Sequence, residues 1–169
     1  EKWGVDYNAI KVTEGKYKGK RCNKKIFEEI RKNEPDDLVV AFVMEEKEVL
    51  KAMQHPVVMI ASDGILNEGQ GHPRAAGTFP RVLGKYVREE NELELINAIE
   101  KITKMPAERL KLNNKGRIKK NYEADITIFD YDQIIDKATF DNPVRSPAGI
   151  EHVIVNGKMV VNEGKLTGN

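Results

Sequence analysis

The spacing of apolar and polar residues predicts alternating strands and helices in the first part of the chain. Residues 9–13 alternate like a short strand, and residues 24–32 place their apolar side chains on one helical face. Residues 38–44 are an unbroken apolar run rich in β-branched residues, which is typical of a strand buried on both faces of a parallel sheet. Residues 45–54 predict an amphipathic helix and residues 57–62 a second buried strand. We therefore expect a right-handed βαβ crossover, the unit of parallel α/β folds.

A glycine-rich loop and two helices are expected next. The loop follows Gly64, and the first helix covers residues 82–89. The second helix covers residues 93–103, because its apolar residues recur on one face. Pro106 is expected to end it.

The last part of the chain has the pattern of an antiparallel sheet. Residues 124–130 and 150–166 are short β runs, and the second contains Asn156-Gly157, a strong signal for a two-residue hairpin turn. Residues 138–149 contain two prolines, which favour an irregular excursion over the surface.

Composition narrows the possible partners and the cell compartment. The 28 basic and 27 acidic side chains leave a formal net charge of +1, which does not favour a nucleic-acid or membrane-surface partner. No apolar stretch approaches the roughly 20 residues that a membrane span needs. The single cysteine, Cys22, excludes an intrachain disulfide framework and favours a reducing cytoplasm.

The second apolar run stops abruptly at Ser62, Asp63 and Gly64. In parallel α/β folds, ligand chemistry collects beyond the carboxyl ends of the strands, so a carboxylate at Asp63 is a candidate functional group. Gly64 would let the backbone turn sharply beside it. The alternative is that Asp63 only caps the segment that follows. The pattern alone does not separate the two interpretations.

Several motifs of this sequence resemble those of one protein family in their order and spacing. Residues 55–168 are similar to the C-terminal part of the D-aminoacylase (N-acyl-D-amino-acid deacylase) family of the amidohydrolase superfamily. The stretch NYEADITIFD is shared widely among amidohydrolases, whereas the others are more specific to the deacylase branch. The motifs are SDG (62–64), HPR (72–74), GTFPRVLG (77–84), NYEADITIFD (121–130) and ATFDNP (138–143).

The resemblance implies an α/β fold made of the C-terminal portion of a (β/α)8 barrel and a small antiparallel β subdomain. Residues 1–112 would belong to the barrel and residues 113–169 to a β-sandwich. The implied activity is metal-dependent hydrolysis of the amide bond of N-acyl-D-amino acids, which are the small-molecule partner. The chain opens at Glu1 and resembles only the end of the family, so we expect a fragment that is inactive alone. Exposed strand edges would favour self-association or pairing with the missing N-terminal part.

The resemblance also implies roles for four residues. Asp63 matches the aspartate that ends the last barrel strand, the general base and acid of the reaction, with a possible contact to a secondary metal site. Arg74 matches the arginine of the HPR motif and would grip the substrate carboxylate, unless it is a loop arginine in an ordinary ion pair. His72 would contact the substrate or orient the loop, and Ser62 would hydrogen-bond Asp63 or the substrate.

The family's primary metal ligands are not found in this sequence. Its three histidines, His55, His72 and His152, are widely spaced and form no His-x-His pair. Zn²⁺ is therefore expected in the full-length enzyme but not as a fully bound ion of this chain. Two alternatives stay open: a non-catalytic structural or interaction module of amidohydrolase ancestry, and a hydrolase of cyclic amides similar to hydantoinases and dihydroorotases.

Overall fold

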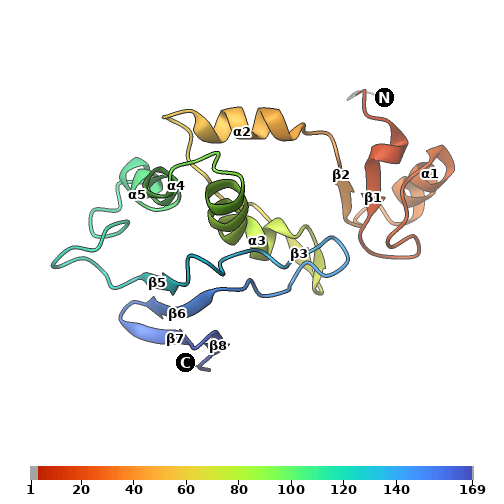
Figure 1. Ribbon diagram of the computed structural model, residues 1–169. Helices are drawn as coiled ribbons and strands as arrows, with labels where there is room; N and C mark the ends of the chain where they lie inside the picture. The colour runs from red at the N-terminus through yellow and green to blue at the C-terminus, as the bar shows by residue number, and fades with distance from the viewer. Residues whose placement is uncertain (1–3, 169) are drawn as a thin grey trace.

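The computed structural model describes residues 4–168, and its elements form three groups along the chain (Figure 1). The first group, the N-terminal unit, has its own small core around Val12, Cys22 and Ile30. The Asn23 side chain accepts a hydrogen bond from the Ile26 amide at 2.9 Å and so caps its helix. The elements of the N-terminal unit are η1 (Tyr7–Ala9), β1 (Ile10–Val12), α1 (Lys24–Asn33) and β2 (Val39–Ala41). The short strand predicted over residues 9–13 and the helix predicted over residues 24–32 are confirmed.

The two buried parallel strands expected over residues 38–44 and 57–62 are not formed. β2 pairs antiparallel with β1, with Ile10 opposite Ala41, and the apolar side chains around it are exposed. Residues 57–62 are in no strand, and of them only Ile60 is buried. A strand becomes buried on both faces only when neighbouring strands and helical layers cover it, and in the described part of the chain β2 has β1 as its only neighbour. The βαβ crossover is therefore absent from residues 4–168.

The second group is a set of helices around the main core. This core includes Val82, Leu83, Tyr86 and Ala98, with Ile134 from the C-terminal part of the chain. In Figure 1 α2 lies along one side of the molecule, and α4 and α5 lie near the C-terminal end of α2. The elements are α2 (Glu46–Gln54), β3 (Leu66–Asn67), β4 (Gln70–Gly71), α3 (Arg74–Arg81), the π-helix η2 (Val82–Glu89), α4 (Leu95–Ile102) and α5 (Lys104–Arg109).

The helical predictions for this group are partly right. The helices over 45–54, 82–89 and 93–103 are confirmed within a few residues, but α3 begins at Arg74, inside the expected loop. The sequence pattern does not predict this helix, because it contains Pro80 and proline lacks the amide donor that a helix interior needs. Pro106 does not end the helical region, since it lies in the first turn of α5, where proline is tolerated.

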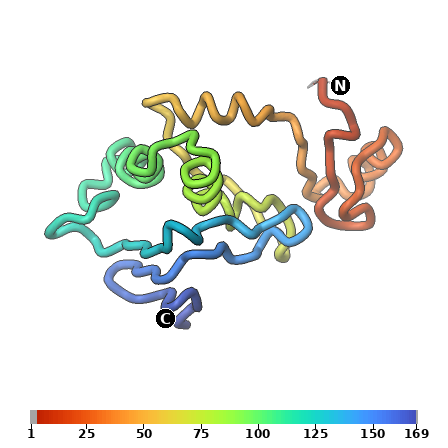
Figure 2. The backbone as a smooth tube through the Cα atoms, in the orientation of Figure 1, coloured from red at the N-terminus to blue at the C-terminus, as the bar shows by residue number. Residues whose placement is uncertain are grey.

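The third group is the antiparallel sheet predicted for the end of the chain. Its strand order is β5 (Ile126–Phe129), β6 (Ile150–Val155), β7 (Lys158–Asn162), β8 (Lys165–Leu166). Asn156 and Gly157 have φ of 51° and 77° and form the predicted hairpin turn between β6 and β7. Figure 2 shows the connection between β5 and β6 running from the sheet towards the N-terminal unit and back. At its far point Lys11 Nζ and Asp141 Oδ1 are 2.7 Å apart.

No helix among residues 4–168 combines the length and the apolar character that crossing a bilayer requires.

Candidate functional site

The candidate site lies on the loop between residue 60 and the start of α3. Asp63 Oδ1 lies 2.9 Å from Arg74 Nε, and the exposed fractions of the two side chains are 84% and 45%. The pair is therefore an open ion pair at the surface, accessible to a ligand. An exposed pair of this kind contributes little to stability, at most about 1 kcal/mol.

Ser62 and His72 hold the backbone of Arg74. Ser62 Oγ donates a hydrogen bond to the Arg74 carbonyl at 2.8 Å, and the Arg74 amide donates to His72 Nδ1 at 3.0 Å. All four candidate residues named from the sequence are thus within one cluster, although they span two separate motifs. Both contacts are with the backbone of Arg74, which fits an orienting role for Ser62 and His72.

The loop that carries Asp63 packs directly against the first turn of α3. A Cβ added to Gly64 would lie 2.4 Å from the backbone nitrogen of Ala75. Since real Cβ atoms do not approach a backbone nitrogen this closely, residue 64 must be glycine for the loop to reach the helix. The glycine therefore brings Asp63 within ion-pair distance of Arg74.

The His72 ring is partly buried against an aromatic residue from the β5–β6 connection. Its centroid lies 5.0 Å from that of Phe140 in an edge-to-face arrangement, and Phe140 in turn lies 4.8 Å from Phe42. Burial lowers the pKa of His72 below its usual value, the Arg74 charge lowers it further, and the Asp63 charge opposes both. These surroundings favour the neutral ring, whose Nδ1 can accept a hydrogen bond from the Arg74 amide.

Phe140 is the site residue that sequence reasoning missed. Its motif, ATFDNP, carries part of the family resemblance, but the sequence of residues 138–149 predicts only a surface excursion. The signal was a lone aromatic residue in a stretch otherwise rich in proline and polar residues. Such a residue needs an apolar partner, and Phe42 and His72 provide it.

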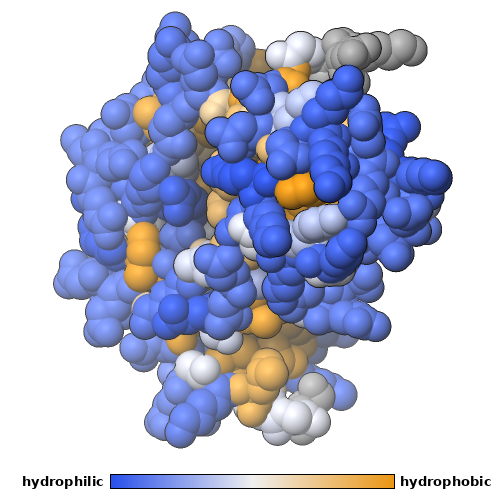
Figure 3. All heavy atoms as spheres, turned by 90° about the vertical axis from the view of Figure 1, so that its right-hand side faces the viewer, coloured by the Kyte–Doolittle hydropathy of each residue, from blue (hydrophilic) through white to orange (hydrophobic). Residues whose placement is uncertain are grey.

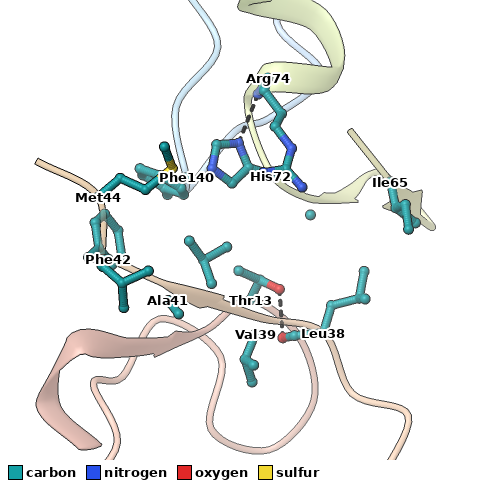
Figure 4. Close-up of a pocket in the computed structure, with 13 residues that line it drawn as sticks. Thr13, Leu38, Val39, Ala41, Phe42, Met44, Ile65, His72, Arg74 and Phe140 are labelled. Carbon is teal, nitrogen blue, oxygen red and sulfur yellow. Dashed lines mark hydrogen bonds between the residues drawn. The ribbon is translucent and has the colours of Figure 1, made fainter. Parts of the chain in front are cut away.

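A cavity of about 580 Å³ opens beside this cluster (Figure 4). Figure 4 shows the His72 ring and the Arg74 guanidinium on one side of it, and the strand that carries Ala41 and Phe42 on the other. Its lining is mainly apolar, and Arg74 is the only charged residue in it. The lining residues are Thr13, the run 38–44, Ile65, Gly71, His72, Arg74 and Phe140. An organic anion with an apolar body would match this combination of surfaces.

The described residues do not fit a primary metal site. In residues 4–168 no group of three or more histidine, cysteine, aspartate or glutamate side chains is arranged to hold a metal ion. Cys22 is buried in the core of the N-terminal unit, and burial raises the pKa of its thiol, which disfavours the thiolate that binds metals. His152 lies in β6, and Asp63 is a single carboxylate that already pairs with Arg74.

Several apolar side chains that line the cavity, and others elsewhere, are exposed at the surface. Figure 3 shows them as separate patches among polar side chains, on the face that is turned to the right in Figure 1. Exposed apolar residues from β2 and the segments that follow it include Phe42, Val43, Met44, Val57 and Ile65. Patches of this kind are typical of surfaces that contact another polypeptide.

Comparison with known proteins shows the family of the chain. The family model described as "Amidohydrolase family" matches residues 38–161. The N-acyl-D-glutamate deacylase of Alcaligenes xylosoxydans xylosoxydans is 46% identical over 118 residues, which are 70% of this chain and 24% of that protein.

Solved structures show the same likeness in three dimensions. A crystal structure of D-aminoacylase superimposes with a TM-score of 0.86 at 31% identity, over 95% of this chain and 36% of that one. The N-acyl-D-glutamate deacylase of Bordetella bronchiseptica superimposes with a TM-score of 0.83 at 33% identity, over 94% of this chain and 35% of that one. That structure holds zinc and a phosphonate inhibitor that mimics the tetrahedral intermediate of the reaction.

The chain spans about a quarter of the length of the curated relative and about a third of each solved structure. The family match covers well over half of its residues, and the structural likeness extends over nearly all of them. The chain therefore belongs to the amidohydrolase family.

Proposed function

We propose that this chain is part of a metal-dependent hydrolase that cleaves the amide bond of N-acyl-D-amino acids, giving a D-amino acid and a carboxylate. The observation that carries the proposal is the exposed Asp63–Arg74 pair at 2.9 Å beside a mainly apolar cavity. In this proposal the carboxylate transfers protons and the neighbouring guanidinium holds the substrate. The names of the related deacylases support the substrate class.

Asp63 is the group we assign to proton transfer. As a general base its carboxylate accepts a proton from the water that attacks the amide carbonyl. As a general acid it then gives this proton to the leaving nitrogen as the C–N bond breaks, so that the amine departs neutral and the carboxylate is restored. The 84% exposure of the side chain leaves it accessible to both water and substrate.

Arg74 is the group we assign to substrate binding. Its Nε contacts Asp63, and its two terminal nitrogens make no hydrogen bond with any residue from 4 to 168. These nitrogens form a planar edge that matches a carboxylate. The α-carboxylate of the substrate would lie against this edge and place the amide bond beside Asp63, with an apolar part in the cavity.

The remaining parts of the proposal concern the whole protein. Residues 1–112 would contribute to the barrel and residues 113–169 to the β-sandwich, with the four-stranded sheet as its part in this chain. The zinc ligands would come from polypeptide other than the described residues, since these hold no metal cluster. The exposed apolar residues around β2 would pack against that polypeptide or against a second copy. The free, buried thiol of Cys22 supports a cytoplasmic location.

Replacing Arg74 separates linear from cyclic amides as substrates. In the complete protein, Arg74→Ala should raise KM for an N-acyl-D-amino acid by roughly 10- to 100-fold, the effect of one charge-assisted bidentate contact. Turnover of a hydantoin, which has no free carboxylate, should stay negligible in both proteins. The matched control is Arg109→Ala, an exposed arginine at the end of α5 with no ion pair in the described chain. An unchanged KM, or preferred hydrolysis of the hydantoin, would contradict the proposal.

A further inference from the structure

Lys101 is a buried lysine at the end of α4, where an apolar residue would be expected. Its exposed fraction is 5%, and with Thr13 it is one of two polar or charged residues in the buried set. No ion pair of residues 4–168 includes it. A lysine is rarely buried without a carboxylate partner, because removing an ammonium group from water is unfavourable unless it is hydrogen-bonded.

The ammonium group and the main-chain carbonyl of Lys101 both hydrogen-bond the segment that leads to Asp63. Its Nζ donates hydrogen bonds to the carbonyls of His55 at 2.6 Å and Val58 at 2.9 Å. Its own carbonyl accepts a hydrogen bond from the Ile60 amide at 3.1 Å. The His55 and Val58 carbonyls lie just beyond the C-terminal end of α2. This is the negative end of the helix dipole, where a cation is favoured. Figure 1 shows α4 close to this end of α2.

The segment from 55 to 62 has little else to hold it. It belongs to no strand, so no ladder of backbone hydrogen bonds fixes it. Its other long-range hydrogen bond is that of Ser62 with the Arg74 carbonyl. Asp63 directly follows Ser62, so it lies between the residues that Lys101 contacts and Arg74, with which its carboxylate pairs.

We propose that Lys101 is a positioning residue for Asp63. The two hydrogen bonds of its ammonium to residues 55 and 58, together with the main-chain bond to residue 60, fix where the strandless segment ends and therefore where the Asp63 carboxylate projects. A methionine would fill the same space without these two donors, so the ammonium serves backbone geometry rather than packing. The inference depends on the proposed function, which makes Asp63 the proton-transferring group.

The test compares Lys101→Met with Lys104→Met in the complete protein. Lys104 lies three residues further on and is partly exposed, with its Nζ paired to Glu100 at 2.8 Å. Lys101→Met should lower kcat for an N-acyl-D-amino acid by up to roughly 100-fold, the effect of a small misplacement of a reacting group, with KM nearly unchanged. Lys104→Met should leave both constants unchanged. If Lys101→Met folds poorly, Lys101→Gln serves, since its amide keeps an N–H donor on a side chain one atom shorter.

Backbone hydrogen exchange provides a readout that does not depend on activity. Amides of residues 57–63 should exchange faster in Lys101→Met than in the unmodified protein, while those of α1 should exchange at the same rate. Unchanged exchange in this segment overturns the inference, and so does faster exchange with an unchanged kcat. If the unmodified protein hydrolyses no N-acyl-D-amino acid, the proposed function fails, and the exchange measurement alone then decides whether Lys101 holds the segment.

Discussion

Arg74 contacts each of the other three candidate residues through a different chemical group. Its carbonyl accepts from Ser62, its amide donates to His72, and its guanidinium pairs with Asp63. The backbone contacts fix where the side chain begins, and the ion pair fixes one edge of its guanidinium. The other edge is left for a ligand. A single residue thus joins the two loop motifs into one site.

The contact with His72 should make the stability of this loop depend on pH. Burial, the main cause, lowers the pKa of His72 in the folded protein below the reference value of 6.5. Between the folded and unfolded pKa values the unfolded chain binds more protons, so stability rises with pH in this window. The contribution is complete above about pH 6.5 and is lost as the pH falls through the folded pKa. Protonated Nδ1 also cannot accept the Arg74 amide, a hydrogen bond worth about 1 kcal/mol.

The variant His72→Asn checks this prediction. Its side-chain oxygen can accept the same amide but does not titrate, so the melting temperature should fall less than in the unmodified protein between about pH 7.5 and pH 5. His152→Asn is the matched control, because this histidine lies in β6, away from the site. Equal pH dependence of the unmodified protein and His72→Asn would contradict the assignment of the neutral ring to residue 72.

At the scale of elements, the close approach of the Asp63 loop to α3 is the critical contact. Gly64→Ala would place a methyl group 2.4 Å from the Ala75 nitrogen, so either the loop or the helix start must move. We expect a loss of about 1–3 kcal/mol in the free energy of unfolding, and a marked fall in kcat because Asp63 moves with the loop. Chemical denaturation and steady-state kinetics measure the two effects.

Gly157→Ala in the hairpin turn is the control, because it replaces a glycine at a position where the added methyl group meets no other atom. A Cβ at Gly157 meets nothing within 4 Å, but its φ of +77° is unfavourable for alanine. This variant should lose about 1–2 kcal/mol of stability and keep its kcat. If Gly64→Ala kept a normal kcat as well, the packing of the loop against α3 would not position Asp63.

Elements with local signals could be predicted from the sequence. The spacing of apolar residues in α1 and α2 and the Asn156-Gly157 turn need only neighbouring residues, and all three are formed. The strands expected over 38–44 and 57–62 depend on distant partners that the pattern cannot display. A run of this kind is buried on both faces only beside further strands, and β2 pairs with β1 alone in the described residues.

Candidate residues for the site could be proposed from the sequence, but their arrangement could not. Asp63, Arg74, His72 and Ser62 could be named because SDG and HPR are short motifs with a recognisable spacing. That Ser62 and His72 contact the backbone of Arg74 follows from the turn geometry between Gly64 and α3, which no motif states. Phe140 reaches His72 and Lys101 reaches the backbone of residues 55 and 58 from distant segments, and only the fold reveals these contacts.

At the scale of the whole molecule, the apolar surface around β2 predicts association. Met44 is 76% exposed and Val43 52% exposed, beside a strand with one free edge. The isolated 169-residue chain should therefore self-associate in sedimentation velocity experiments. Val43→Asp should shift it towards the monomer, because a charge at this surface opposes burial.

Ile118→Asp is the control for that substitution. Ile118 is 87% exposed but lies after α5, away from β2. The substitution Ile118→Asp should leave the sedimentation profile unchanged. A strictly monomeric unmodified chain, or an equal response to both substitutions, would contradict the assignment of the contact surface to β2.

The most direct test of the account is the turnover number of Asp63→Asn in the complete protein. The amide has nearly the same shape but cannot take up and return a proton, so kcat for an N-acyl-D-amino acid should fall by about 10²- to 10⁴-fold. The melting temperature should hardly change, because the side chain is 84% exposed and its ion pair with Arg74 stabilises the fold little. A kcat close to that of the unmodified protein would show that the carboxylate at position 63 does not transfer the proton.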